Sequence, residues 1–229
     1  LSYEEAYKRR FSKSIDWEKE DIPVPSFLGR RELLDFPLGE LRKYIDWTFF
    51  FKTWELKGSF PRILEDSTRG AAARELFENA NALLQKIADE KLLRANAVYG
   101  FWPANSIGDD IVLYTDNSRI EEQTRFNMLR QQKFSGEHSL CLSDFIAPQK
   151  TRIGDYIGAF AVTAGIGASE LAGKYEASGD DYNAIMVKAL ADRLAEAFAE
   201  KLHQEARMEW GFADDAAITN EDLNKEKYR

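Results

Sequence analysis

DYNAIMVKALADRLAEAFAEKLHQEAR, residues Asp181–Arg207, is the stretch from which the fold prediction starts. It contains no Gly or Pro and is rich in Ala, Leu, Glu, Lys and Arg, which all favour helix. Asp180 and Asp181 stand where an N-cap and a first turn are expected, with their charge toward the helix dipole. Apolar residues recur at steps of three and four, which predicts one buried stripe made of Tyr182, Met186, Leu190, Leu194, Ala197 and Phe198.

Three acids, Asp192, Glu196 and Glu200, follow one another at four-residue steps along one flank of this stripe. Like charges at this spacing cost ~0.2–0.5 kcal/mol per pair, and Lys188 and Arg193 offset part of that cost. The commoner interpretation of such a run is a solvated helix edge. The alternative is that the carboxylates face a cleft and bind a cation there, and the helix alone does not decide between the two.

Composition limits the classes of function. A chain of 229 residues with 44% hydrophobic residues is expected to form one large domain or two small ones. Its net charge of -8 argues against nucleic acid or an anionic membrane as the main partner. One cysteine, Cys141, and two histidines, His138 and His203, argue against a disulfide framework, a thiolate site and a His-rich metal site. No apolar run is long enough for a bilayer and no signal peptide is recognisable, so the cytoplasm is the default compartment.

Several shorter segments complete the predicted secondary structure. Helices are expected at residues 1–14, 38–46, 71–92 and 221–229 in addition to the long one. Strands are expected at residues 31–36, 97–102, 111–114, 120–128 and 155–163. Residues 103–110 (PANSIGDD) have turn chemistry, Gly165 and Gly167 are expected to form a turn, and Ser169 is a candidate N-cap. Consecutive strands joined by short turns predict antiparallel pairing rather than a doubly wound sheet.

One further acid, Asp46, stands at a helix end among the aromatic residues of WTFFFKTW, residues 47–54. A carboxylate surrounded by aromatic side chains needs hydrogen bonds or a cationic partner. Two roles are equally expected for the Asp46 carboxylate: capping of the following turn, and ligand binding. The glycines of Ala164–Gly167 fit neither the dinucleotide nor the Walker pattern, and a structural turn is favoured there. Asp109 and Asp110 are interpreted as turn residues rather than metal ligands, and a hydrolase based on His138 or His203 has no motif in its favour.

Five separated blocks carry a resemblance to a known family: LRKYIDWTFFFKTW (41–54), FPRILED (60–66), FWPANSIGDD (101–110), DYIGAFAVT (155–163) and residues 180–203. Together they closely resemble the activation domain of cobalamin-dependent methionine synthase. The similarity runs from about residue 28 to the end. Residues 1–27 are accordingly expected to be an N-terminal helix and linker-like approach, and residues 28–229 an activation domain truncated at its C-terminal end.

The resemblance implies a single C-shaped domain of α/β (α+β) type, with a central twisted antiparallel sheet flanked by long helices. It also implies a methyltransferase module that binds S-adenosylmethionine and presents it for reductive methylation of cob(II)alamin. The implied partners are the cobalamin-binding domain of the same enzyme and flavodoxin or a similar reductase, without nucleic acid or membrane. Cobalamin is expected in the neighbouring domain, and zinc only in the homocysteine domain of the full enzyme.

Two site residues carry over by position. Asp46, in Tyr-Ile-Asp-Trp, matches the family's aspartate that holds the amino group of the methionine moiety. Glu196, in Leu-Ala-Glu-Ala-Phe, matches the glutamate that supports the same end. The family's Arg-x-x-x-Gly-Tyr segment is expected after Tyr228 and does not occur in this sequence, so weak binding of S-adenosylmethionine, or none, is expected. The alternative function is a docking module for the cobalamin domain and flavodoxin without competent ligand binding.

Overall fold

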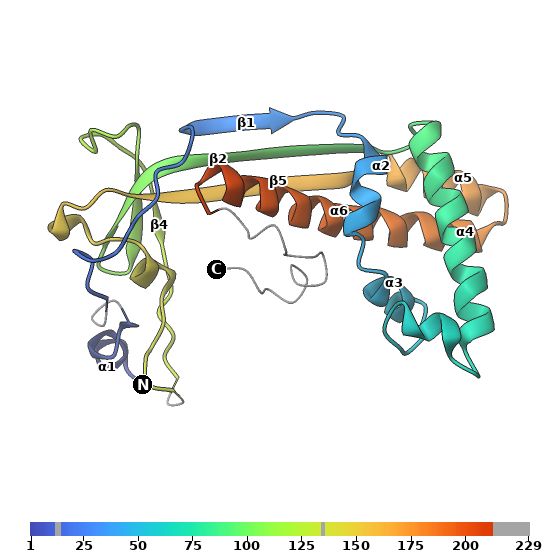
Figure 1. Cartoon of the computed structure of the whole chain (residues 1–229), viewed down its shortest axis with the longest axis horizontal. Helices are drawn as coiled ribbons and strands as arrows, with labels where there is room; N and C mark the ends of the chain where they lie inside the picture. The colour runs from blue at the N-terminus through green and yellow to red at the C-terminus, as the bar shows by residue number, and fades with distance from the viewer. Residues whose placement is uncertain (12–14, 134–135, 213–229) are drawn as a thin grey trace. The chain divides into compact units, whose positions relative to one another are not determined.

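The computed structural model describes residues 1–11, 15–133 and 136–212, and these form helices and one five-stranded sheet (Figure 1). The helices are α1 (Tyr3–Lys8), α2 (Leu38–Leu41), α3 (Trp47–Thr53), α4 (Gly70–Asp89), α5 (Ala168–Ala177) and α6 (Asp181–Glu209). The strands are β1 (Gly29–Leu33), β2 (Arg94–Ile107), β3 (Asp110–Tyr114), β4 (Glu122–Asn127) and β5 (Asp155–Ile166). Short 3-10 turns occur at Arg42–Tyr44, Arg62–Glu65, Leu142–Phe145 and Gln149–Thr151.

The sheet has the strand order β1-β2-β3-β4, and β5 also pairs with the long strand β2. Strands β2 and β3 are antiparallel, with Ala104 opposite Leu113, and β3 and β4 are antiparallel, with Ile111 opposite Phe126. The two-residue connection Gly108–Asp109 permits the pairing of β2 with β3, as short turns do in meanders. The predicted α/β fold with an antiparallel sheet and long helices is therefore confirmed.

Contacts divide the chain into two units, which are described separately. Unit 1 comprises Leu1–Arg31, Tyr99–Ala159 and Met208–Phe212, and the described part of unit 2 comprises Glu32–Val98 and Phe160–Arg207. The boundary falls inside β1, β2 and β5, so each of these strands contributes residues to both units. The domain start expected near residue 28 stays a prediction.

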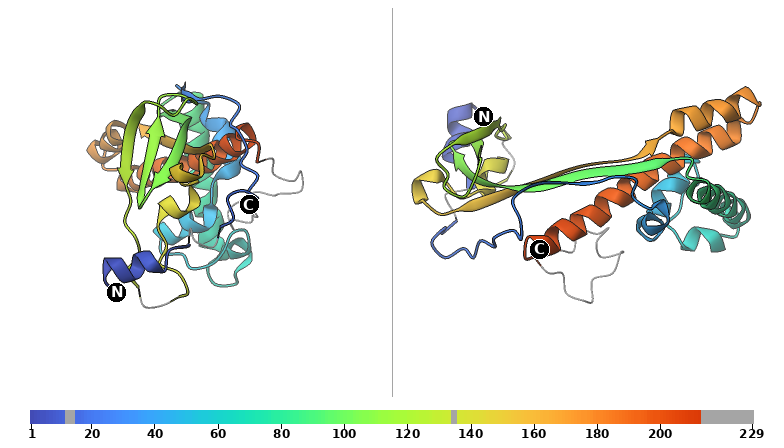
Figure 2. Two further views of the ribbon diagram at one scale, coloured as in Figure 1. Left: turned by 90° about the vertical axis from the view of Figure 1, so that its left-hand side faces the viewer. Right: turned by 90° about the horizontal axis from the view of Figure 1, so that it is seen from above.

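Helix α6 and its neighbours form the framework of unit 2. The backbone N–H of Asn183 donates to Asp180 Oδ1 at 3.0 Å, which confirms Asp180 as the N-terminal cap. The core-facing stripe is fully buried at Met186, Leu190, Leu194, Phe198 and Leu202. Figures 1 and 2 show α5 alongside the first part of α6, where Lys188 Nζ lies 2.8 Å from Glu176 Oε1.

The predicted buried stripe is wrong at one position, Tyr182, which is 41% exposed. Its ring lies 5.1 Å from that of Trp54, and its hydroxyl accepts a hydrogen bond from Asn79 Nδ2 at 3.2 Å. A tyrosine hydroxyl needs a polar partner, and Tyr182 finds one at the edge of the core rather than inside it. Periodicity places a residue on a face but does not say how far the core extends along the helix.

The turn predicted at residues 103–110 is present only at Gly108–Asp109 and is wrong for residues 103–107, where β2 continues as a strand to Ile107. The polar side chains there are buried but satisfied. Asn105 Nδ2 donates to the carbonyl oxygens of Ala147 and Ile153, each at 2.9 Å. Ser106 Oγ donates to Ile146 O at 2.8 Å. Carbonyls from distant residues thus replace the water that this turn-like sequence would otherwise contact.

The turn predicted at Gly165 and Gly167 is present only at Gly167. Gly165 belongs to β5, whereas Gly167 has φ +96° and is the N-cap of α5. A Cβ at Gly167 would lie 2.9 Å from Leu92 O, so this position needs glycine for both reasons. Ser169 is the second residue of α5 and not its cap. The helix predicted at residues 221–229 lies outside the described residues.

Unit 1 has a small apolar core on its sheet, made of Ala104, Ile111 and Leu113. Trp102, Met128, Ile146 and Ile157 pack against it. The helix predicted within residues 1–14 is present as α1, where Ser2 and Glu5 form a reciprocal capping box.

Candidate functional site

A hollow of about 280 Å³ in unit 2 is lined by residues of α3, the turn before it, and α6. The lining residues are Tyr44, Asp46, Phe49, Arg193, Glu196 and Glu200. The structure thus brings together Asp46 and Glu196, the two acids that the sequence analysis singled out. Helix α6 contributes the acids on its exposed flank, while its opposite stripe is anchored in the core.

Asp46 acts as the N-cap of α3, because its Oδ1 accepts the backbone N–H of Thr48 at 2.8 Å. Its second oxygen, Oδ2, has no hydrogen-bond partner among the described residues. The following aromatic residues hold the turn in place: Trp47, Phe50 and Phe51 are buried. The capping interpretation of Asp46 is therefore correct, and one carboxylate oxygen remains available at the hollow.

Glu196 projects from α6 as an exposed side chain, and its carboxylate has no ion pair within the described part of the chain. Glu200, one turn later, also lines the hollow. Asp192, one turn earlier, instead pairs with Arg193 Nη2 and does not line it. The acidic flank therefore divides: Asp192 fits the solvated-edge interpretation, and Glu196 and Glu200 fit the cleft interpretation.

Arg193, Phe49 and Tyr44 line the hollow without having been singled out from the sequence as site residues. The Arg193 side chain is only 16% exposed, and its Nε has no acceptor among the described residues. Its guanidinium carbon lies 5.7 Å from the centre of the Phe49 ring, and Tyr44 OH donates to Gln204 Oε1 at 3.0 Å. Arg193 could have been identified from the sequence by its three-residue spacing from Glu196, because residues at this spacing share a helix face.

The charges of the hollow indicate what kind of ligand it suits. Three carboxylates, from Asp46, Glu196 and Glu200, face one guanidinium, that of Arg193. This excess of negative charge favours a ligand that carries positive charge. Phe49, which is 51% exposed, adds an apolar face. Over the described residues there is no group of three or more His, Cys, Asp and Glu side chains with metal-binding geometry.

The other candidate residues have structural surroundings in unit 1. Asp109 lies in the β2–β3 turn, as predicted, and its carboxylate is held by Arg130 at 2.7 Å. Cys141 is buried. The ring of His138 packs against Phe11 with centroids 5.3 Å apart. None of the helices in the described ranges is both long and apolar enough to cross a membrane.

The fold and the hollow together define an α/β domain with a small hollow lined mainly by acidic side chains. Comparison with known proteins agrees with the resemblance seen in the sequence. The family model for the activation domain of vitamin B12 dependent methionine synthase matches residues 37–229, so the chain belongs to this family.

A solved structure is also similar, namely the crystal structure of the MetH reactivation domain bound to AdoHcy. It shares 47% sequence identity with this chain at a TM-score of 0.95. The alignment covers 100% of this chain and 70% of that chain. The family predicted from the five sequence blocks is thereby confirmed.

Proposed function

We propose that the hollow of unit 2 binds S-adenosylmethionine and presents its methyl group for the reductive reactivation of methionine synthase. The observation that supports this most directly is that Asp46 and Glu196 line one hollow, where Asp46 Oδ2 and the Glu196 carboxylate make no hydrogen bond or ion pair with the described residues. Membership of the activation-domain family and the AdoHcy in the related crystal structure support the same ligand class.

The chemistry of the ligand suits these acids. S-adenosylmethionine carries an ammonium and a sulfonium, both positive. Asp46 Oδ2 and the Glu196 carboxylate accept hydrogen bonds from the ammonium, directly or through water. Charge-assisted hydrogen bonds of this kind contribute ~1.5–3 kcal/mol each. Because Asp46 is fixed by its cap to Thr48, its free oxygen is held in position before the ligand arrives.

The residues of this chain contribute placement rather than proton transfer. In methyl transfer the S–CH3 bond breaks and sulfur keeps the electron pair, so the ligand leaves as a neutral thioether. Cobalamin, when held by its own domain, supplies the methyl acceptor, and a reductase such as flavodoxin supplies the electron. The protein promotes the transfer mainly by positioning the two reacting centres.

In this proposal, cobalamin and zinc are bound by other domains of the whole enzyme. Cobalamin belongs to the neighbouring cobalamin-binding domain, with which this domain interacts during reactivation. Zinc belongs to the homocysteine domain. The reaction is that of a cytoplasmic methyltransferase in methionine biosynthesis, of which this domain is the reactivation module.

The test is substitution of each acid in a methionine synthase that carries this domain. Asp46→Asn keeps a good N-cap for α3, and Glu196→Gln keeps the side-chain shape, so each removes charge with little disturbance. Reactivation is monitored by the loss of cob(II)alamin absorbance, and this gives the concentration of S-adenosylmethionine that half-saturates reactivation. We expect it to rise about tenfold or more in each variant, the equivalent of about 1.4 kcal/mol.

Glu78→Gln is the matched control, because Glu78 is exposed on α4 and does not line the hollow. Glu78→Gln should leave reactivation unchanged. All three substitutions should leave association with the reductase unchanged. If Asp46→Asn and Glu196→Gln reactivate as the parent enzyme does, the docking-module alternative replaces the proposal.

A further inference from the structure

Unit 1 contains a second hollow, of about 440 Å³, to which the proposed function assigns no role. It lies between the end of α1, the segment around Trp17, the end of β2 and the 3-10 turn at Gln149–Thr151. This volume falls within the range of ordinary small-molecule sites. The side chains that decide its chemistry are Tyr7, Arg10, Trp17 and Lys150.

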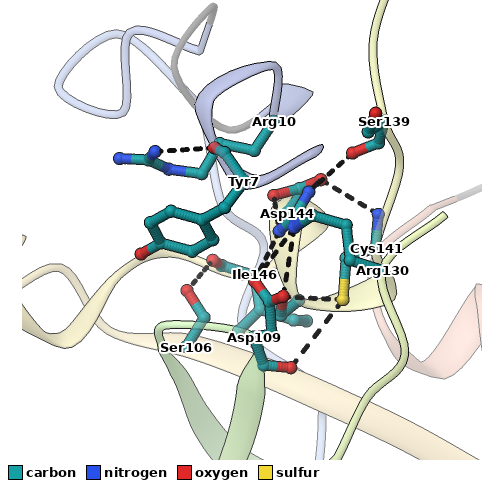
Figure 3. A network of polar contacts seen from close by, with 10 residues as sticks. Tyr7, Arg10, Ser106, Asp109, Arg130, Ser139, Cys141, Asp144 and Ile146 are labelled. Carbon is teal, nitrogen blue, oxygen red and sulfur yellow. Dashed lines mark hydrogen bonds and ion pairs between the residues drawn. The ribbon is translucent and has the colours of Figure 1, made fainter. Parts of the chain in front are cut away.

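Two cations line this hollow without a carboxylate partner. Arg10 Nη1 donates to the backbone oxygen of Tyr7 at 2.9 Å, and the guanidinium lies over the Tyr7 ring at 4.3 Å (Figure 3). The remaining guanidinium N–H groups of Arg10 have no acceptor among the described residues. Lys150 is exposed and likewise has no ion pair in the described parts of the chain. Both cations are thus available to an anion.

Trp17 provides an unsatisfied donor at the same place. Its indole Nε1 is buried and has no hydrogen-bond partner among the described residues. Leaving a buried donor without an acceptor costs free energy that an acceptor on a ligand would restore. The Trp17 indole and the Tyr7 ring both line the hollow and give it an aromatic wall.

Two acids near the hollow, Asp109 and Asp144, are already paired with a cation. Arg130 binds Asp109 and Asp144, with an N–O distance of 2.7 Å to each (Figure 3). Ser106, which lines the hollow, uses its hydroxyl hydrogen for Ile146 O. Of the described residues that line the hollow, none carries a carboxylate. The hollow therefore has an excess of donors and positive charge in a protein whose net charge is -8.

We propose that this hollow binds a small organic anion: a carboxylate or phosphate monoester attached to a flat apolar body. Arg10 and Lys150 bind the anionic group. The rings of Trp17 and Tyr7 contact the apolar body, and an acceptor on the ligand takes the Trp17 indole N–H. The site is separate from the acidic hollow of unit 2 and selects for the opposite charge.

The test is an NMR titration of the whole chain labelled with nitrogen-15, which gives one indole signal for each of its five tryptophans. Trp17→Phe assigns the signal of interest. The probes are 1-naphthoate and 1-naphthyl phosphate, with the neutral 1-naphthamide as the matched control. We expect both anions to shift the Trp17 indole signal saturably and to bind at least about tenfold more tightly than the amide.

Arg10→Gln and Lys150→Gln are each expected to weaken the anions severalfold while leaving the amide unaffected. Lys133→Gln is the control, because Lys133 is an exposed lysine of the same unit that does not line the hollow. The backbone spectrum of each variant shows whether it is folded. Equal binding of amide and anions, no shift of the Trp17 signal, or equal weakening by Lys133→Gln would each overturn the proposal.

Discussion

Carboxylates in this chain serve different purposes according to their partners. Asp46 divides its two oxygens between a helix cap and the hollow of unit 2. Asp109 and Asp144 are instead bound by Arg130, whose side chain is completely buried. Burial alone would lower the pKa of Arg130, but hydrogen bonds to Asp144 and Asp109 outweigh it and raise the pKa above its usual value. Arg130 is therefore charged at every pH at which the protein is folded.

At this scale we predict that Arg130→Met destabilises the protein by ~3–5 kcal/mol, because two acids then remain in a buried setting without their cation. Urea unfolding followed by circular dichroism measures the change. Arg125→Met is the control: Arg125 pairs with Glu122 and Asp110 on the surface, where ion pairs contribute little.

Replacing both acids in the Arg130→Met variant, by Asp109→Asn and Asp144→Asn, should recover part of the lost stability. An Arg130→Met variant no less stable than Arg125→Met would show that the buried network is not held together by charge.

At the scale of elements, close backbone approaches set which positions tolerate a side chain. A Cβ on Gly100, in β2, would meet the carbonyl oxygen of Gly29 in β1 and lie 3.0 Å from Arg30 Cα. A Cβ on Gly158, in β5, would lie 2.9 Å from the ring of Trp210. Gly173, inside α5, has open space instead. Gly100 and Gly158 thus have no room for the methyl group of alanine, whereas Gly173 does.

We therefore expect Gly100→Ala to lower the free energy of unfolding by ~1–3 kcal/mol, because backbone atoms must move to admit the methyl group. Gly173→Ala should raise the free energy of unfolding by ~0.5–1 kcal/mol, since alanine restricts the unfolded chain and fits the helix. Thermal unfolding of the two variants beside the parent checks both signs. A Gly100→Ala protein as stable as the parent would contradict the close approach of β1 and β2.

At the scale of the whole molecule, the two units are continuous through their strands. Residues Arg94–Val98 of β2 belong to unit 2, and the remaining residues of that strand belong to unit 1. Strand β5, which pairs with β2, is divided in the same way. Cooperative units of unfolding usually coincide with continuous supersecondary structure.

We predict that both parts of β2 exchange their amide hydrogens through the same opening reaction. Hydrogen exchange with mass spectrometry at increasing urea should give one denaturant dependence for peptides covering residues 94–98 and 99–107. Two distinct dependences would show that the units open independently.

Local spacing and turn chemistry determined much of the fold. Helix α6 was predictable because its apolar stripe and the Asp180 cap are read from residues a few positions apart. The antiparallel sheet followed from strands joined by short turns. Asp46 and Glu196 were identified by their resemblance to the activation-domain family, while their residue patterns alone left capping and a solvated edge as open alternatives.

Only the tertiary structure decided which of these alternatives apply, because the deciding contacts join distant residues. Asp46 and Glu196 share a hollow since α3 and α6 meet there, and Arg193 and Phe49 complete it. Residues 103–107 form a strand because carbonyls near residue 147 satisfy their polar side chains. Periodicity specifies the face on which a residue lies, but the partner that faces it is chosen by packing between elements far apart in the chain.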